Sequence, residues 1–262
     1  MTAAGFFDVA EGPGPLVATA IHDGHEVRED LRERFALNEA TRLREEDPFT
    51  GEWTAVAGTR VVVRRSRFEV DLNRPRERAV YREPADAWGL DIWKAPLPDE
   101  VVEASLAEYD AFYARLERLL KEVTARAGGF VVFDLHSYNH RRGGAGAEVD
   151  DPEANPEINI GTGSLDRGRW GPLADRLMSD LRDFDFLGRR LDVRENVKFS
   201  GGNMTRHIHR ELPEAGCCIA IEAKKIFMNE WTGEKDAPTH SAVGAALLAS
   251  VPGVLEELQK VI

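Results

Sequence analysis

The sequence predicts an α/β domain built on a mostly parallel sheet that helices cover on both faces. Three short apolar runs, at 16–21, 130–136 and 217–225, are rich in strand-forming residues, and each ends in polar or charged side chains. Segments with helical spacing lie between these runs. Strands that alternate with helices of ten or more residues are typical of a parallel sheet with covered faces.

The N-terminal part of the sequence begins with a stretch rich in glycine and proline. We expect residues 1–15 to form a loose arm. The apolar run 16–21 (LVATAI) predicts a buried strand that ends at a polar loop. Residues 26–44 are charged and have helical spacing, residues 45–53 form a loop broken by proline and glycine, and residues 59–75 hold one or two strands.

A long helix follows a proline-containing loop at 76–98. Its apolar residues recur in steps of three and four, the spacing of one helix face, and they are Val102, Leu106, Tyr109, Tyr113, Leu116, Leu120 and Val123. We expect this face to pack on the sheet, because a coiled coil would need more heptads. The helix begins at Asp99 and ends at Gly128-Gly129, and the run 130–136 (FVVFDLH) then predicts a second buried strand.

The last part of the sequence continues this alternation. Apolar runs predict strands, helical spacing predicts helices, and polar stretches with glycine predict loops. The expected elements are a loop at 137–156, a strand at 157–162, a helix at 170–186, an extended segment at 191–197, a loop at 199–216, a third buried strand at 217–225 and a helix at 240–261 kinked at Pro252. Neither a repeat nor a linker interrupts the sequence, so we expect one domain over residues 1–262.

Composition and charge exclude several classes of protein. A chain of 262 residues with 42% hydrophobic residues can bury a core, and a net charge of −12 argues against binding to a phosphate backbone. We find no run near the roughly 18 apolar residues of a membrane span and no signal peptide. The two cysteines, Cys217 and Cys218, are neighbours that cannot easily form a disulfide. We therefore expect a cytoplasmic protein that binds neither nucleic acid nor membranes; the sequence leaves the oligomeric state open.

The three apolar runs end in residues that could bind a metal. His22 and His25 follow the first run, His136 ends the second, and Glu222 lies near the end of the third. If these strands are parallel, their carboxyl ends meet at one edge of the sheet, where ligands bind in α/β proteins. Imidazoles with carboxylates are the ligands of a catalytic zinc site, where a bound water becomes acidic and a nearby glutamate can take its proton. Asp134 is a candidate hydrogen-bond partner for His136.

Each of these residues also has a purely structural interpretation. A single histidine at a strand end is commonly a hydrogen-bonded structural residue, and the spacing of His22 and His25 also occurs by chance. Glu222 is different, because a carboxylate within the apolar run CCIAIE is costly to bury unless it is paired or functional. Lys224 is its structural alternative as an ion-pair partner. The conjunction of all three strand ends favours the metal site.

A second group of residues is suited to binding a carboxylate. Arg67, Asn73 and Arg74 lie in SRFEVDLNRPR, and Arg206 lies in GGNMTRHIHR. A planar guanidinium binds a carboxylate through two parallel hydrogen bonds, and asparagine adds a donor. An enzyme that recognises a free carboxylate beside a scissile amide needs such groups. The alternative is that these arginines only balance an acidic surface.

The order of these motifs resembles that of the N-formylglutamate amidohydrolase (deformylase) family. The similarity extends over residues 16–228 and is carried by His22-Asp23-Gly24 and by the segments SRFEVDLNRPRE (66–77), DLHSYN (134–139) and FSGGNMTRHIHRELPEAGCCIAIEAKKIFMN (199–229). The wider relatives of this family are zinc carboxypeptidases and aspartoacylase-like deacylases. The resemblance implies a phosphorylase/hydrolase-like three-layer α/β fold with a mixed, mostly parallel central sheet.

The resemblance also implies an activity and roles for individual residues. It implies a hydrolase that depends on Zn²⁺, or on another divalent transition metal, and cleaves the N-acyl amide, such as the N-formyl amide, of a small acidic amino acid. His22 and His136 match the zinc histidines, and Glu222 matches the glutamate that acts on the zinc-bound water. The carboxylate-binding positions match Arg67, Asn73, Arg74 and Arg206.

The third metal ligand stays open at this point. His25 stands where carboxypeptidase-like relatives have a glutamate, whereas the deformylase pattern has an acidic residue further on, at Glu46 or Asp47; we favour Asp47. We expect His207 to donate a hydrogen bond on the substrate side. Two other functions compete with the amidohydrolase: a carboxypeptidase-like peptidase, and a metal-dependent binding protein without catalysis on the same scaffold.

Overall fold

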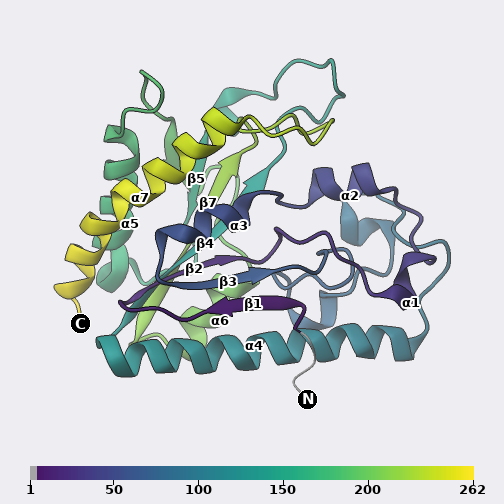
Figure 1. Ribbon diagram of the computed structural model, residues 1–262, viewed down its shortest axis with the longest axis horizontal. Coiled ribbons are helices and arrows are strands. Elements are labelled where there is room, and N and C mark those ends of the chain that lie inside the picture. Colours follow the sequence, from purple (N-terminus) through teal and green to yellow (C-terminus); the bar gives the residue numbers. More distant parts are fainter. Residues whose placement is uncertain (1–4) are drawn as a thin grey trace.

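A mixed seven-stranded sheet forms the centre of the computed structural model, which describes residues 5–262 (Figure 1). The strand order is β1-β3-β2-β4-β7-β5-β6. The strands are β1 (Phe7–Ala10), β2 (Leu16–Ala20), β3 (Thr59–Val63), β4 (Phe130–Tyr138), β5 (Ile158–Gly161), β6 (Val193–Glu195) and β7 (Gly216–Lys224). β3, β2, β4 and β7 run parallel, while β1 and β5 pair antiparallel to β3 and β7. The α/β class and the mostly parallel sheet are confirmed.

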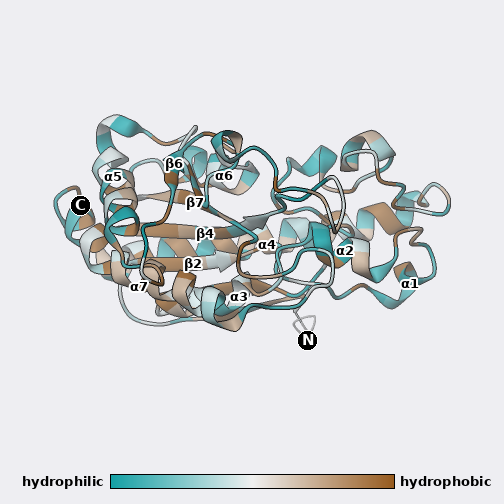
Figure 2. Cartoon of the chain, turned by 90° about the horizontal axis from the view of Figure 1, so that it is seen from above, coloured by the Kyte–Doolittle hydropathy of each residue, from teal (hydrophilic) through white to brown (hydrophobic). Residues whose placement is uncertain are grey.

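Helices cover both faces of this sheet and make three layers (Figures 1 and 2). The helices are α1 (Glu29–Arg32), α2 (Glu39–Glu45), α3 (Thr50–Trp53), α4 (Asp99–Ala127), α5 (Arg167–Asp183), α6 (Asn203–Glu211) and α7 (Ala237–Gln259), with short 3-10 turns between them. α3, α5 and α7 pack on one face, through residues such as Trp53, Leu177 and Leu247. On the other face, α4 and α6 pack on the sheet through Leu116, Ile208 and their neighbours.

The alternation of side chains along β4 explains how one strand supplies both cores. Val131, Phe133 and Leu135 pack in the core beneath α5 and α7. Phe130 and Val132 pack in the core beneath α4. Successive residues of a strand point to opposite faces, so a strand that is covered on both sides is apolar throughout. β4 is buried along its whole length.

The long helix α4 agrees closely with its prediction. All seven residues of the predicted apolar stripe are buried, and Gly128 ends the helix with φ 84°. Glycine adopts this left-handed conformation without the penalty of a Cβ atom. The stripe packs on the sheet and on α6.

The structure corrects three expectations about the chain. Residues 7–10 of the expected N-terminal arm form β1, which pairs with β3; residues 1–4 lie outside the described residues. The expected loop at 199–216 contains the helix α6, and the expected loop at 45–53 contains α3. The expectation of one or two strands within 59–75 is confirmed, with β3 as the single strand there.

The helix α7 is long and apolar enough to cross a membrane by length and composition alone. That criterion is also met by core helices, and α7 contributes Val243, Leu247 and Val254 to the core on the sheet. The helix expected at 240–261 is confirmed, although it begins at Ala237 and ends at Gln259.

Candidate metal centre and cavity

The parallel strands β2, β4 and β7 are neighbours, so their carboxyl ends lie at one edge of the sheet. His22 follows β2 after one residue, and His136 lies near the end of β4. Glu222, on β7, is the register partner of His136. The fold therefore brings these three strand ends together, as the sequence predicts.

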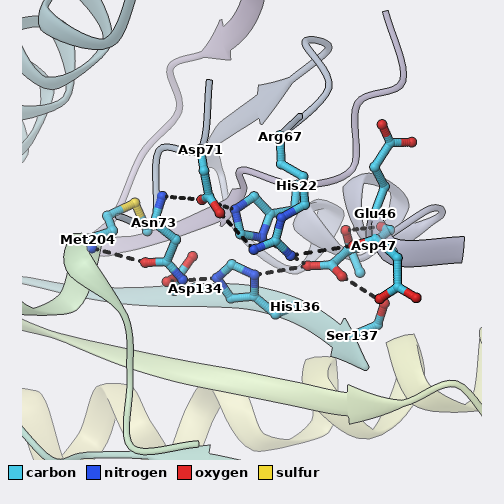
Figure 3. A network of polar contacts seen from close by, with 12 residues as sticks. His22, Glu46, Asp47, Arg67, Asp71, Asn73, Asp134, His136, Ser137 and Met204 are labelled. Atoms are coloured by element: carbon cyan, nitrogen blue, oxygen red, sulfur yellow. Dashed lines mark hydrogen bonds and ion pairs between the residues drawn. The ribbon is translucent and has the colours of Figure 1, made fainter. Parts of the chain in front are cut away.

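His22, Asp47 and His136 form a compact buried cluster (Figure 3). One ligand atom from each residue lies within 4.8 Å of the others. Both histidines direct Nδ1 to Asp47 Oδ2, at 3.4 Å from His22 and 3.0 Å from His136. Asp47 comes from the segment between α2 and α3, where its amide donates to the carbonyl of His22 (2.9 Å). Two imidazole nitrogens and one carboxylate oxygen are donors that zinc prefers, so this cluster fits the metal that the resemblance implies.

A second carboxylate lies behind each histidine. His22 Nε2 is 2.8 Å from Asp71 Oδ1, and His136 Nε2 is 3.0 Å from Asp134 Oδ2 (Figure 3). Asp134 also accepts a hydrogen bond from Thr19 Oγ1 at 3.0 Å. Such outer carboxylates fix the orientation of metal-binding histidines and make them more basic. Both Nδ1 atoms are thereby left to face Asp47.

The charges of the cluster stabilise one another. Burial alone would raise the pKa of Asp47, but hydrogen bonds and charges from His136 and His22 hold that pKa well below its ordinary value. Burial lowers the pKa of His136, yet the nearby Asp134 and Glu222 raise it well above its ordinary value. Asp47 is therefore ionised at neutral pH, as a metal ligand must be.

Glu222 lies in the same cavity with a raised pKa. Its side chain is buried, and this burial raises its pKa to about 7, an effect that the charge of His136 partly offsets. Lys224 does not pair with it, because Lys224 Nζ donates to the carbonyl of Asn155 at 2.7 Å. A carboxylate whose pKa lies near neutrality can take and return a proton at that pH.

A cavity of about 590 Å³ opens onto the cluster and Glu222. It is lined by many of the residues that the sequence nominates for the site, namely His22, Asp47, Arg67, Asn73, Arg74, His136 and Glu222. Arg142, Lys198 and Trp88, from three separate loops, also line it. The cavity is thus rich in cationic groups around a buried acidic and imidazole floor.

Asp71, the carboxylate behind His22, also contacts Arg67, Asn73 and Arg74. Arg67 Nη2 donates to Asp71 Oδ2 at 2.8 Å, and Arg74 lies over the ring of Tyr81, whose hydroxyl also donates to Asp71. Asn73 ties this segment to the start of α6. Its side-chain Oδ1 accepts from the Met204 amide at 3.1 Å, and its carbonyl accepts from the Asn203 amide at 3.0 Å.

Gly202 makes this junction possible. A Cβ atom at Gly202 would lie 2.0 Å from Asn73 Oδ1, far inside contact distance. The two motif segments therefore interlock, with the side chain of Asn73 occupying the space beside Gly202.

His25 lies outside the cluster. Its Nδ1 contacts the buried carboxylate of Glu46, its Nε2 lies 3.2 Å from Arg42 Nη2, and its side chain is 36% exposed. Glu46 also accepts from the Ser66 hydroxyl. Of the three candidates for the third ligand, the geometry therefore groups Asp47, and neither His25 nor Glu46, with the two histidines.

Arg206 and His207 do not line the cavity. Arg206 is exposed on α6, and its Nη1 donates to the carbonyl of Gly201 at 3.2 Å. His207 faces α4, where its Nε2 lies 3.1 Å from Glu117 and its ring packs against Tyr113. Residues 203–211 are helical, so that Arg206 contacts Gly201, which lines the cavity, and His207 faces α4; the substrate contacts expected of both residues stay predictions.

The site also contains groups that the sequence patterns do not single out. Asp71 lies within the DLNR segment, in which the sequence analysis assigns only Asn73 and Arg74 a role, as carboxylate-binding residues. Ser137 donates to Asp47 Oδ1 at 3.3 Å, and its position beside His136 is the only hint in the sequence. Lys225, fully buried in the floor of the cavity, has its pKa lowered by burial to about 8. An apolar strand that ends in two lysines is the corresponding hint for Lys225.

Comparisons with known proteins agree with this fold. The sequence profile of the N-formylglutamate amidohydrolase family matches residues 14–228. The fold is similar to that of the crystal structure of N-formylglutamate amidohydrolase from Ralstonia eutropha JMP134, with a TM-score of 0.72 and 20% identity over 97% of each chain. It is also similar to the gene product Atu2144 from Agrobacterium tumefaciens, with a TM-score of 0.70 and 18% identity over 97% of this chain and 96% of that one. No curated protein matches the sequence significantly.

Proposed function

The chain belongs to the N-formylglutamate amidohydrolase family, and from that premise we propose that it is a zinc-dependent hydrolase that cleaves the N-formyl amide of an acidic amino acid such as N-formylglutamate. The observation that carries the proposal is the convergence of His22 Nδ1, His136 Nδ1 and Asp47 Oδ2 beside the buried Glu222. An amidohydrolase needs a metal-binding set and a proton carrier in one cavity.

The metal-binding residues in this proposal are His22, Asp47 and His136. Three protein ligands leave a coordination position for water or substrate, as in other catalytic zinc sites. A bound zinc ion supplies Lewis-acid chemistry, which lowers the pKa of water and polarises a carbonyl group. Asp71 and Asp134 hold the two imidazole rings in the orientation that the ligands need.

Glu222 carries the proton in this mechanism. Its carboxylate takes a proton from the attacking water, whose oxygen adds to the carbonyl carbon of the formyl amide. When the carbon–nitrogen bond breaks, Glu222 returns that proton to the leaving amine nitrogen. The products are formate and the free amino acid, and Glu222 ends in its starting ionisation state. The pKa of about 7 supports both transfers near neutral pH.

The arginines of the cavity bind the carboxylates of the substrate. Arg67 and Arg74 line the cavity, and each also lies near the carboxylate of Asp71. Asp71 thus orients both the guanidinium groups and the His22 imidazole, which couples substrate placement to the metal-binding set. A guanidinium that is fixed in this way binds a carboxylate with less loss of side-chain freedom.

The direct test measures zinc and hydrolysis in the same preparation. We expect about one zinc ion per chain, and release of formate from N-formyl-L-glutamate that a chelator abolishes. N-formyl-L-leucine, which lacks the second carboxylate, is the matched control and should be cleaved more slowly. Zinc binding without hydrolysis of N-formyl or N-acetyl derivatives of glutamate and aspartate would refute the enzyme and favour a binding protein. Absence of stoichiometric metal would refute the assignment of the cluster.

A further inference from the structure

Lys225 is a buried lysine immediately after β7, three residues beyond Glu222. It is 1% exposed, although lysine is almost never fully buried unless its charge is paired or hydrogen-bonded. Its Nζ donates to two backbone carbonyls, those of Arg44 at 2.5 Å and Glu46 at 2.7 Å. Both acceptors lie far from Lys225 in the sequence, so the ammonium joins the end of β7 to the segment at 44–46.

The two carbonyls lie at the C-terminal end of α2. The last carbonyls of a helix have no partner within the helix and carry the negative end of its dipole. An ammonium group is therefore well placed there, and it fixes the chain on either side of Glu45. Asp47 directly follows Glu46, whose carbonyl is one of the two acceptors. The amide of Asp47 is held from the opposite side by the carbonyl of His22.

The backbone of Lys225 belongs to the sheet edge that carries the other groups of the site. Its amide donates to the carbonyl of Tyr138 at 3.0 Å, which extends the pairing of β4 with β7. His136 and Glu222 are register partners within that pairing. Lys225 thus spans from the strands that carry His136 and Glu222 to the segment that carries Asp47.

We propose that Lys225 is a positioning residue that fixes Asp47 relative to His136 and Glu222 and so preforms the metal-binding set. This inference rests on the proposed function, in which Asp47 is a ligand. The hydrogen bonds act on the backbone before Asp47 and leave its carboxylate free. Loss of the ammonium leaves the carbonyls of Arg44 and Glu46 without this donor, and the Asp47 segment gains freedom that metal binding must then remove.

The test compares Lys225→Met with Lys224→Met. Methionine keeps the apolar stem and removes the ammonium in both variants. The neighbouring Lys224 is a matched control, because its Nζ also donates to a backbone carbonyl, that of Asn155, but not to the segment before Asp47. Competition with a chromophoric chelator gives the zinc dissociation constant. We expect Lys225→Met to bind zinc roughly 10- to 100-fold more weakly, the usual range for loss of an outer support of a metal site. Lys224→Met should keep the wild-type affinity.

Amide hydrogen exchange in metal-free protein provides a second readout that does not depend on activity. We expect faster exchange over residues 46–50 in Lys225→Met and unchanged exchange there in Lys224→Met. Lys225→Arg, which retains charge and donors, should restore part of the protection. If Lys225→Met does not fold, Lys225→Gln, which retains a donor group, takes its place in the same comparison.

The outcomes separate this inference from the proposed function. Wild-type zinc affinity and wild-type exchange in a folded Lys225→Met variant would overturn the role of Lys225 and leave the amidohydrolase standing. A wild-type protein that binds no zinc would overturn the proposed function and the role of Lys225 in a metal-binding set, whatever the exchange experiment finds.

Discussion

His136 and Glu222 are register partners on the neighbouring parallel strands β4 and β7. Adjacent strands lie about 4.8 Å apart, so the sheet itself sets the spacing between a metal-ligand candidate and the proton carrier. Burial and the charge of His136 act in opposite directions on the pKa of Glu222. The position of Glu222 is therefore set by the sheet.

Replacement of this carboxylate by its amide is the most direct test of the proton transfer. Glu222→Gln keeps the shape of the side chain but cannot accept a proton, so we expect kcat to fall by roughly 10²- to 10⁴-fold. Zinc content should remain at the wild-type value, because Glu222 lies outside the His22, Asp47 and His136 cluster. Initial rates and metal analysis of one preparation check both parts. Full activity in this variant would remove Glu222 from the mechanism.

The third metal ligand can be identified by comparing two alanine variants. We expect Asp47→Ala to lose stoichiometric zinc, because it removes the oxygen that both histidines face. His25→Ala should retain zinc, since His25 is directed to Glu46 and Arg42. Metal analysis after dialysis against a weak chelator distinguishes them. Retention of zinc by the Asp47 variant together with its loss from the His25 variant would reverse the assignment.

Two arginines that the sequence analysis assigns to carboxylate binding should behave differently. Arg67→Lys removes a guanidinium that lines the cavity, and we expect kcat/KM for N-formylglutamate to fall roughly 10- to 100-fold, the scale of one hydrogen bond to a charged group. Arg206→Lys should leave kcat and KM unchanged, because Arg206 is exposed on α6 outside the cavity. Steady-state kinetics on both variants check the contrast. An equal loss in the Arg206 variant would mean that this residue reaches the substrate.

The partly buried His209 predicts how stability changes with pH. Its Nε2 accepts from the amide of Cys218 at 3.0 Å, so Nδ1 carries the proton and donates to Ser164 Oγ at 2.8 Å. Burial lowers its pKa to about 4. Between pH 4 and about 6.5, the unfolded chain therefore binds a proton that the folded chain does not, and the free energy of unfolding falls as the pH falls.

The test of this linkage is His209→Gln, whose side-chain oxygen can still accept from Cys218 but cannot titrate. Over that pH window we expect His209 to contribute a slope of up to about 1.4 kcal/mol per pH unit, and we expect the variant to lack this contribution. Chemical denaturation at pH 7.5 and pH 5 measures both. A variant with the wild-type pH dependence would show that His209 is not the group responsible.

The sequence is sufficient for the framework of the fold because its main elements are locally encoded. β2, β4 and β7 are continuous apolar runs, and α4 has a regular apolar stripe. The grouping of three residues at the strand ends follows from this framework. Parallel neighbours deliver their carboxyl ends to one place, so the amino-acid sequence alone groups His22, His136 and Glu222.

The remaining features depend on contacts between distant segments. α6 offers only two apolar anchors, Met204 and Ile208, and its first turn is held by Asn73 from a segment far earlier in the sequence. Its local sequence therefore looks like a loop, and the sequence does not show that the helix leaves Arg206 and His207 out of the cavity lining. The choice of Asp47 over His25 likewise depends on a contact between distant segments. The segment after α2 places the carboxylate of Asp47 beside His136 on β4.

The interlock of Asn73 with Gly202 has a consequence for how this protein can be recombined. The asparagine fills the space that any larger residue at position 202 would need, so the two motifs form a matched pair within one chain. A chimera that joins two relatives at a crossover between residues 73 and 202 inherits half of this pair from each parent. Such chimeras should keep this junction only where both parents carry asparagine at position 73 and glycine at position 202. Crossovers before residue 73 or after residue 202 take both residues from one parent.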